Sequence, residues 1–364
     1  MISKNYLIFV SAILLSVLLI PLSVYSQIVR PTGTSSKASS QLIYVYDSFD
    51  EDNPDLENAS AIQVTNTNDT EGVWIHVQVF RNFDPDVSFT ADGGFVNGPE
   101  QPVICDERDF IDFLTPNDTH AYNIFDDPEL LYKNEGESET QQGEQVNIDL
   151  LGTKGFIVIT PIVSESDLTA ISFQYLTGNF YIDDFIINSN AMGRDAVDFT
   201  TGETLPDGSP LDGETGGFVV LQPDEFLTDF STTSDVETQT TTVQLVAIVF
   251  QDIYGPPGLL GYVVAPASTQ WNSFIFDFKE DPTSCGIKTI ECFDDFGLNQ
   301  TFTQFNPLLG DDLLCGSTST PPHPFTGGFG WVRIFVSGLD NFVNHLAFFG
   351  KPDDFIGGKW MFTK

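Results

Sequence analysis

The sequence predicts an all-β protein built as two packed antiparallel β-sandwiches, immunoglobulin-like or jelly-roll-like, with very little helix. Three observations support this fold class. Apolar side chains recur at every second position in many short segments, which is the period of a half-buried strand. Segments rich in Gly, Pro, Asn, Asp and Thr separate these stretches, as expected for turns. Hydrophobic residues make up 41 % of the 364 residues, which is enough for one large core or two ordinary ones.

The strand signals are of two kinds. Residues 73–81, 271–278 and 330–336 alternate between two faces, as half-buried strands do. Residues 156–163 and 243–250 are apolar on both faces and are therefore expected to be central strands that are covered on both sides. The two halves of the chain offer similar numbers of short strands, which favours two sandwiches over one.

Turn chemistry connects these strands. Residues 66–72 predict a hairpin that joins 61–65 to 73–81, and residues 177–179 predict one that joins 171–176 to 180–184. Residues 115–118 predict a turn before a strand at 119–124, and residues 82–102 predict a surface excursion. The one helix suggested is residues 223–227, where Pro223 precedes acidic residues as at a helix start.

The first 26 residues are expected to be a secretory signal peptide. Lys4 precedes an apolar run, and Val24-Tyr25-Ser26 has the small-residue pattern of a cleavage site. The alternative is an uncleaved N-terminal anchor, because the run at 6–24 is just long enough to span a bilayer. We therefore expect a secreted, periplasmic or cell-surface protein.

The mature chain is expected to divide into two units. The predicted parts are a flexible N-terminal segment at 27–40, a first β-sandwich at 41–199, a linker at 200–217 and a second β-sandwich at 218–364. The linker is assigned because it is rich in Gly, Pro, Asp and Thr. A single intertwined sandwich with long insertions is the alternative.

The net charge of -38 comes from 52 acidic and 14 basic residues. Such a surface repels nucleic acid and anionic lipid, so we expect no nucleic-acid partner and membrane contact only through an uncleaved leader. Cell-envelope components or glycans are the partners that remain.

Four cysteines are present, namely Cys105, Cys285, Cys292 and Cys315. An even number in an exported chain predicts disulfides. If all four pair, Cys105 must bond to one of the three C-terminal cysteines, and the two halves must then touch. Zinc is a poor interpretation because no two cysteines have the short spacing of structural zinc sites.

A resemblance rests on residues 62–66, the strand from Trp74 to Phe80, Cys105 and residues 113–120. Over residues 61–125 the chain resembles a segment of uncharacterised exported bacterial and archaeal proteins with immunoglobulin-like sandwiches. The resemblance implies a fold and a location, and it implies no catalytic residue.

Catalytic motifs are missing from the sequence. It has no Gly-x-Ser-x-Gly elbow, no His-Glu-x-x-His and no phosphate-binding Gly-rich loop.

The histidines, which we interpret as structural or merely exposed, are His76, His120, His323 and His345. Asp183 and Asp184 are the least ordinary acid–base candidates, although a solvated strand end is the simpler interpretation. Sugar rings could stack on exposed tryptophan side chains. The chain has four tryptophans, most of which are expected in the core: Trp74, Trp271, Trp331 and Trp360.

Calcium is the one cofactor that the sequence suggests. The weak candidate ligands are the carboxylates of an oxygen-rich cluster, namely Asp47, Asp50, Asp52 and Asp55. The cluster lacks the spacing of an EF-hand, so it would bind calcium as a loop site. The alternative is a solvated acidic turn that binds no metal. Weaker acidic pairs are Asp294-Asp295, Asp311-Asp312 and Asp353-Asp354. Four sequons make candidate glycosylation sites at Asn58, Asn68, Asn117 and Asn299.

Taken with export and the missing motifs, these patterns favour a non-catalytic secreted or cell-surface β-sandwich protein with a structural, adhesive or recognition role. The alternative is a carbohydrate-binding module or a glycan-active hydrolase on a β-sandwich scaffold.

Overall fold

The computed structural model describes sixteen segments of the chain: residues 38–47, 60–83, 87–89, 95–97, 105–124, 130–135, 145–147, 153–182, 187–197, 217–218, 225–232, 244–254, 262–276, 282–297, 328–337 and 343–350. Strand accounts for 81 % of this part, and no helix occurs in it. The predicted all-β fold of packed antiparallel sheets is confirmed.

The first sandwich consists of two six-stranded sheets. Sheet I has the order β13-β12-β2-β7-β8-β9 and comprises Ile187–Asn190, Leu176–Ile182, Ser60–Asn66, Thr119–Ile124, Leu130–Glu135 and Gln145–Asn147. Sheet II has the order β14-β1-β10-β3-β6, with β11 beside β10, and comprises Met192–Arg194, Gln41–Asp47, Thr153–Ser164, Val73–Phe83, Asp106–Leu114 and Asp167–Ala170.

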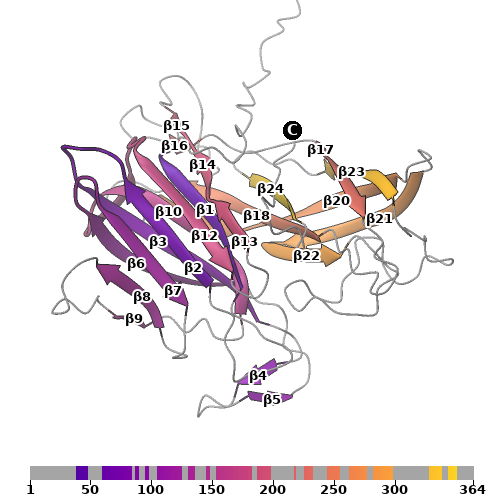
Figure 1. The fold of residues 1–364 in the computed structure, drawn as a ribbon, viewed down its shortest axis with the longest axis horizontal. Helices are drawn as coiled ribbons and strands as arrows, with labels where there is room; N and C mark the ends of the chain where they lie inside the picture. The colour runs from indigo at the N-terminus through magenta and orange to yellow at the C-terminus, as the bar shows by residue number, and fades with distance from the viewer. Residues whose placement is uncertain are drawn as a thin grey trace, which may run out of the picture.

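The second sandwich consists of two four-stranded sheets, which lie beside the first sandwich (Figure 1). Sheet III centres on β18, which pairs with β19, β22 and β24; the four strands are Gln244–Tyr254, Tyr262–Pro266, Phe293–Gly297 and Val343–Gly350. Sheet IV has the order β17-β23-β20-β21 and comprises Glu225–Thr232, Gly328–Ser337, Ser268–Phe276 and Pro282–Glu291. Two short ribbons complete the strands: β15-β16 at Ala196–Val197 and Gly217–Phe218, and β4-β5 at Val87–Phe89 and Phe95–Asn97.

The two sandwiches pack face to face through sheets II and III. Along β18, Val246, Ile248 and Phe250 join the apolar core that includes the first sandwich, whereas Val249 and its alternate neighbours fill the core against sheet IV. The ring of Phe156 in β10 stacks on that of Phe250 in β18, with centroids 5.9 Å apart. Sheets II and III are therefore covered on both faces, which explains why residues 156–159 of β10 and 245–250 of β18 are apolar on both faces.

The predicted helix at 223–227 is wrong. Residues 225–232 form β17, which pairs with β23 and puts Phe226 opposite Ile334. Phe226 is buried, and its ring lies 5.0 Å from that of Trp271. The burial of this side chain in the second core outweighs the local helix-start signal.

The hairpin predicted at 66–72 is also wrong. β2 belongs to sheet I and β3 to sheet II, so this loop crosses from one layer of the sandwich to the other. The buried Asn66 side chain closes the crossing by donating hydrogen bonds to the carbonyls of Glu71 and Thr115. The turn predicted at 115–118 is confirmed, with Asn117 at φ 57°, and so is the following strand, β7.

The hairpin predicted at 177–179 does not form either. β12 continues through Gly178 because it pairs with β2 on both sides of that residue. Beside Gly178, the hydroxyl of Tyr44 donates a hydrogen bond to the carbonyl of Gln63 at 3.0 Å. A Cβ at Gly178 would lie 2.1 Å from that hydroxyl oxygen. The glycine therefore allows a close approach and does not form a turn.

Candidate functional site at the junction of the two sandwiches

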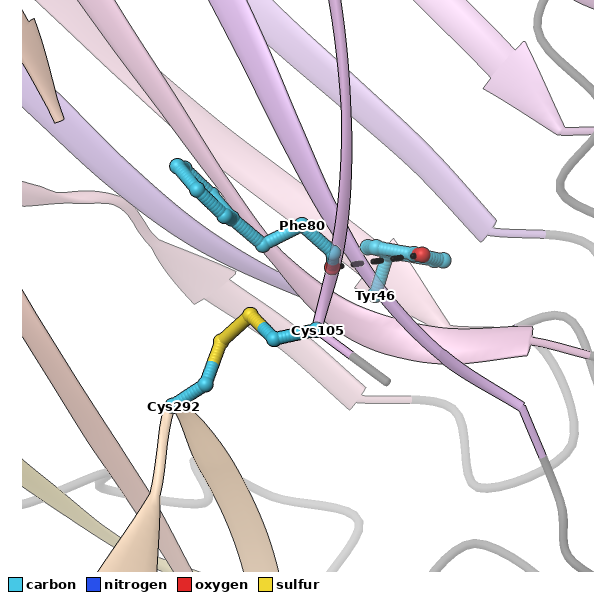
Figure 2. The surroundings of a disulfide bond; sticks show 4 residues. All are labelled: Tyr46, Phe80, Cys105 and Cys292. Atoms are coloured by element: carbon cyan, nitrogen blue, oxygen red, sulfur yellow. Dashed lines mark hydrogen bonds between the residues drawn. A yellow bond between two sulfur atoms is a disulfide. The ribbon is translucent and has the colours of Figure 1, made fainter. Parts of the chain in front are cut away.

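A disulfide between Cys105 and Cys292 joins the two halves of the chain across 187 residues, with the two Cα atoms 6.1 Å apart. Cys105 directly precedes β6 in sheet II, and Figure 2 shows the bridge reaching from that strand to the second sandwich beside Phe80 and Tyr46. The sequence predicted that Cys105 bonds to a C-terminal cysteine, and its partner is Cys292. The side chain of Cys285 and the whole of Cys315 lie outside the described residues.

Cys292 occupies the corner where the chain passes from sheet IV to sheet III. Its carbonyl accepts a hydrogen bond from the Val249 amide at 2.7 Å, and its amide donates to the Ala267 carbonyl at 2.8 Å. The residue has φ 64°, in the left-handed region, which allows the sharp change of direction between β21 and β22. The disulfide therefore attaches to a fixed point of the second sandwich.

A buried ion pair forms the polar centre of the same junction. Arg194 of β14 donates two hydrogen bonds to Asp252 of β18, at 3.2 and 2.5 Å, and neither side chain is exposed to solvent. The Tyr262 hydroxyl donates to the same carboxylate at 2.7 Å. Gln41 of β1 in turn donates to the Tyr262 hydroxyl at 2.9 Å and to the Thr160 hydroxyl at 2.7 Å. These five residues, which we call the junction network, include members from both sandwiches.

Aromatic rings enclose the Arg194 guanidinium. Its central carbon lies 5.3 Å from the ring centroid of Phe218 and 5.4 Å from that of Phe250, within the range of cation–π attraction. Burial lowers the pKa of Arg194, but Asp252, with smaller contributions from Tyr262 and Tyr254, raises it, so the pKa lies above its ordinary value. Burial raises the pKa of Tyr262, and the charge of Asp252 raises it further. The network thus holds a charged pair beside a neutral phenol.

A second link across the junction protects a sheet edge. The Gln78 amide of β3 donates to the carbonyl of Val264 in β19 and accepts from its amide, both at 3.0 Å. The side chain thus takes the place of a neighbouring strand at the edge of sheet III. Gln78 also donates to Glu107 at 2.6 Å, and burial raises the pKa of that glutamate despite this bond.

The first sandwich has its own polar cluster between sheets I and II. The buried Asp112 carboxylate contacts His120 Nδ1 at 2.6 Å and accepts from the Tyr122 hydroxyl at 2.6 Å and from the Phe113 amide at 2.7 Å. On its other side, His120 Nε2 lies 3.3 Å from Asp118. Burial raises the pKa of Tyr122, and the charge of Asp112 adds to this effect. The carboxylate's hydrogen bonds are therefore taken up within the fold.

The other predicted histidines and tryptophans have distinct surroundings. His76 is buried and lies 2.8 Å from Asp109, whose pKa this hydrogen bond lowers. His345 is buried among the apolar side chains of the second sandwich, and burial lowers its pKa to about 4. Within the described segments, neither of its ring nitrogens has a hydrogen-bond partner. Trp271 lies in the same core, whereas Trp74 is half-buried with its ring 4.9 Å from that of Phe113.

Two of the sequon asparagines fall within the described residues. Asn68 is buried, and its side-chain oxygen accepts hydrogen bonds from the Thr70 amide, the Thr70 hydroxyl and the Glu71 amide. Asn117 is exposed in its turn. The remaining candidates lie outside the described residues, in whole or as side chains; these are Asp47, Asp50, Asp52, Asp55, Asn58, Asp183, Asp184, Asn299, His323, Trp331 and Trp360.

The chemistry available to these clusters is limited. Across the described segments, no group of three or more His, Cys, Asp or Glu side chains could hold a metal ion. The Asp112 and Asp252 carboxylates are buried and bonded to other side chains of the fold. Their arrangement suits the fixing of one layer against another more than it suits proton transfer to a ligand.

Sequence reasoning missed Arg194, Asp252, Gln41 and Gln78. One signal was present, because Asp252 continues the face of β18 that carries Ile248 and Phe250, where an apolar residue is expected. A carboxylate at such a position calls for a buried cation, but nothing in the sequence selects Arg194 among the fourteen basic residues.

Comparison with protein-family models, with curated proteins and with solved structures gave no match. No helix long and apolar enough to cross a bilayer is present in the part of the chain that the structure describes.

Proposed function

We propose that this chain is a non-catalytic secreted or cell-surface protein in which two β-sandwiches act as one stiff unit with a structural, adhesive or recognition role. The observation that carries the proposal is the junction itself. A disulfide between Cys105 and Cys292, a buried Arg194–Asp252 pair and a continuous apolar core all connect the two sandwiches.

The chemistry of the described residues supports a role without turnover. A catalytic acid or base has to reach substrate, yet Asp112, His120 and Asp252 are buried and bonded to other side chains. The leader-like first 26 residues and the disulfide support export, because disulfides persist in oxidising compartments. The net charge of -38 keeps such a surface soluble and away from nucleic acid.

The topology of the disulfide suits a protein that is held at its ends. Force applied at the two ends of the chain cannot extend the residues between Cys105 and Cys292 while the bond is intact. Reduction would allow roughly 620–670 Å more of extended chain, from 187 residues at about 3.3–3.6 Å each. Single-molecule extension of the oxidised and reduced chain measures this difference directly.

The test of the non-catalytic role is a hydrolase screen. The full chain, with its disulfides intact, is incubated with polysaccharides, peptides and esters, and product release is followed. We expect no turnover above a heat-denatured control. Turnover that a single carboxylate substitution abolishes would refute the proposal and would favour the alternative, a glycan-active hydrolase on this scaffold.

A further inference from the structure

One end of the first sandwich carries three segments that hydrogen bonds hold together. Within the loop between β2 and β3, the Asn68 carbonyl accepts from the Asn117 amide at 2.9 Å. The Thr67 amide and hydroxyl both donate to the Tyr175 carbonyl at 2.8 Å. Asn66 ties the same loop to the carbonyl of Thr115 at 3.0 Å. This loop end is therefore organised before any ligand arrives.

Two large aromatic rings are exposed at the flanks of the loop. Phe113 is 38 % exposed and Tyr175 is 46 % exposed. Each ring is braced from beneath. The Phe113 ring lies over Gly72, where a Cβ would be 2.6 Å from its Cζ, and packs against Trp74. The Tyr175 ring meets the buried Phe173 ring edge-on, with centroids 5.2 Å apart.

The stretch between these rings is polar and solvent-exposed. It presents the hydroxyls of Thr67 and Thr70 and the carboxylates of Asp69 and Glu71. The Thr67 and Thr70 hydroxyls already donate to the Tyr175 carbonyl and to Asn68 Oδ1, so these two hydroxyls and the two carboxylates offer acceptors to a ligand. The surface thus alternates a rigid apolar ring, a row of polar groups and a second rigid ring.

We propose that this loop end, made of Thr67, Asp69, Thr70, Glu71, Phe113 and Tyr175, binds an uncharged polysaccharide. The inference rests on the proposed recognition role and names its ligand class. Sugar rings have apolar C–H faces that pack on aromatic side chains, and their hydroxyls hydrogen-bond to carboxylates and to threonine hydroxyls. Because both exposed rings are already braced, ligand binding loses little side-chain entropy.

Charge narrows the ligand class. A chain of net charge -38 repels polyanions, so acidic glycans and nucleic acids are disfavoured. The carboxylates of Asp69 and Glu71 at this surface act in the same direction. A basic peptide is the rival occupant, since cations can also contact aromatic faces and carboxylates.

The experiment measures binding of the full chain to a soluble β-glucan, a mannan and dextran, with a polyuronate and polylysine as charged comparisons. The test variants are Phe113→Ala, Tyr175→Ala and the double variant, each checked for an unchanged melting temperature. Ile287→Ala is the matched control, because Ile287 is 66 % exposed on β21 of the second sandwich. Release of reducing ends is followed in the same samples.

We expect at least one of the uncharged polysaccharides to bind. Its dissociation constant should rise roughly tenfold or more in the double variant. Binding by Ile287→Ala should be unchanged. Should Phe113→Ala melt early, Tyr175→Ala alone carries the test, because that ring lies at the surface.

Binding to none of the three polysaccharides, equal binding by the double variant, or binding to polylysine alone would overturn the inference. None of these outcomes touches the non-catalytic role. Reducing-end release would refute the non-catalytic role and leave the binding surface in place.

Discussion

Arg194 and Asp252 form a two-point ion pair across the junction of the two sandwiches, and both side chains are fully buried. A buried pair of this kind gains little net stability over apolar residues of the same shape, but leaving either charge alone in the interior is costly. One partner comes from sheet II and the other from sheet III, so the pair links the two sandwiches.

Substitution Arg194→Met is expected to leave Asp252 buried without its cation. The free energy of unfolding should fall by about 3–5 kcal/mol, measured by urea denaturation. The control is Arg333→Met, which breaks a half-buried pair with Glu225 in sheet IV and should have a much smaller effect. A similar loss in both variants would contradict the role assigned to the junction pair.

Removal of the disulfide is expected to destabilise the whole chain and not only one sandwich. For the loop closed by Cys105 and Cys292, the chain-entropy relation gives about 5 kcal/mol for the double substitution to serine. Denaturant midpoints for the oxidised wild type and the variant measure the loss. Non-reducing peptide mapping should recover the two cysteines in one linked peptide, and a free Cys105 thiol would refute the assignment.

Position 178, occupied by Gly178, is expected to tolerate no side chain. In Gly178→Ala the new Cβ would meet the Tyr44 hydroxyl oxygen at 2.1 Å and the Gln63 carbonyl at 2.4 Å, so stability should fall by about 3 kcal/mol. Adding Tyr44→Phe removes the first clash only, and we expect partial rescue in thermal melts. Full tolerance of Gly178→Ala would mean that this close approach is absent.

His345 makes the stability of the chain depend on pH. In the folded protein it protonates near pH 4, whereas its ordinary pKa is 6.5. Between these two pH values, His345 binds more protons in the unfolded chain than in the folded chain. The contribution of His345 to the free energy of unfolding therefore falls as the pH drops from 6.5 towards 4, and it is constant outside that window.

The variant His345→Leu removes this dependence. The free energy of unfolding of the variant minus that of the wild type should be about 2 kcal/mol larger at pH 5 than at pH 8, because only the wild type loses stability as the pH falls. Urea denaturation at the two pH values measures the change, and the comparison between them cancels any packing effect of leucine. A difference between variant and wild type that is the same at both pH values would show that His345 titrates normally.

The sequence pattern predicted the strands well and their neighbours poorly. Alternation fixes which face of a strand is apolar, so β3, β10, β18 and β23 could be located from sequence. It does not say which strand lies alongside. The loop after β2 therefore looked like a hairpin turn, although it crosses between sheets, and the glycine of β12 looked like a turn residue.

At the junction, too, the sequence pattern did not identify which residues become partners. Counting cysteines predicted a long-range bond from Cys105, but the choice of Cys292 depends on a corner that forms only when sheets III and IV meet. The ion pair joins residues 58 positions apart in a chain with 52 acidic side chains, so the pattern could not single it out. Such pairings are products of tertiary packing.

Hydrogen exchange along a denaturant series measures whether the two sandwiches unfold as one unit. Amides of β10 report on the first sandwich and amides of β18 on the second. We expect the oxidised chain to open both strands with the same midpoint and the same free energy, because the disulfide, the Arg194–Asp252 pair and the shared apolar core link the two sandwiches. Two separate midpoints in the oxidised chain would contradict it.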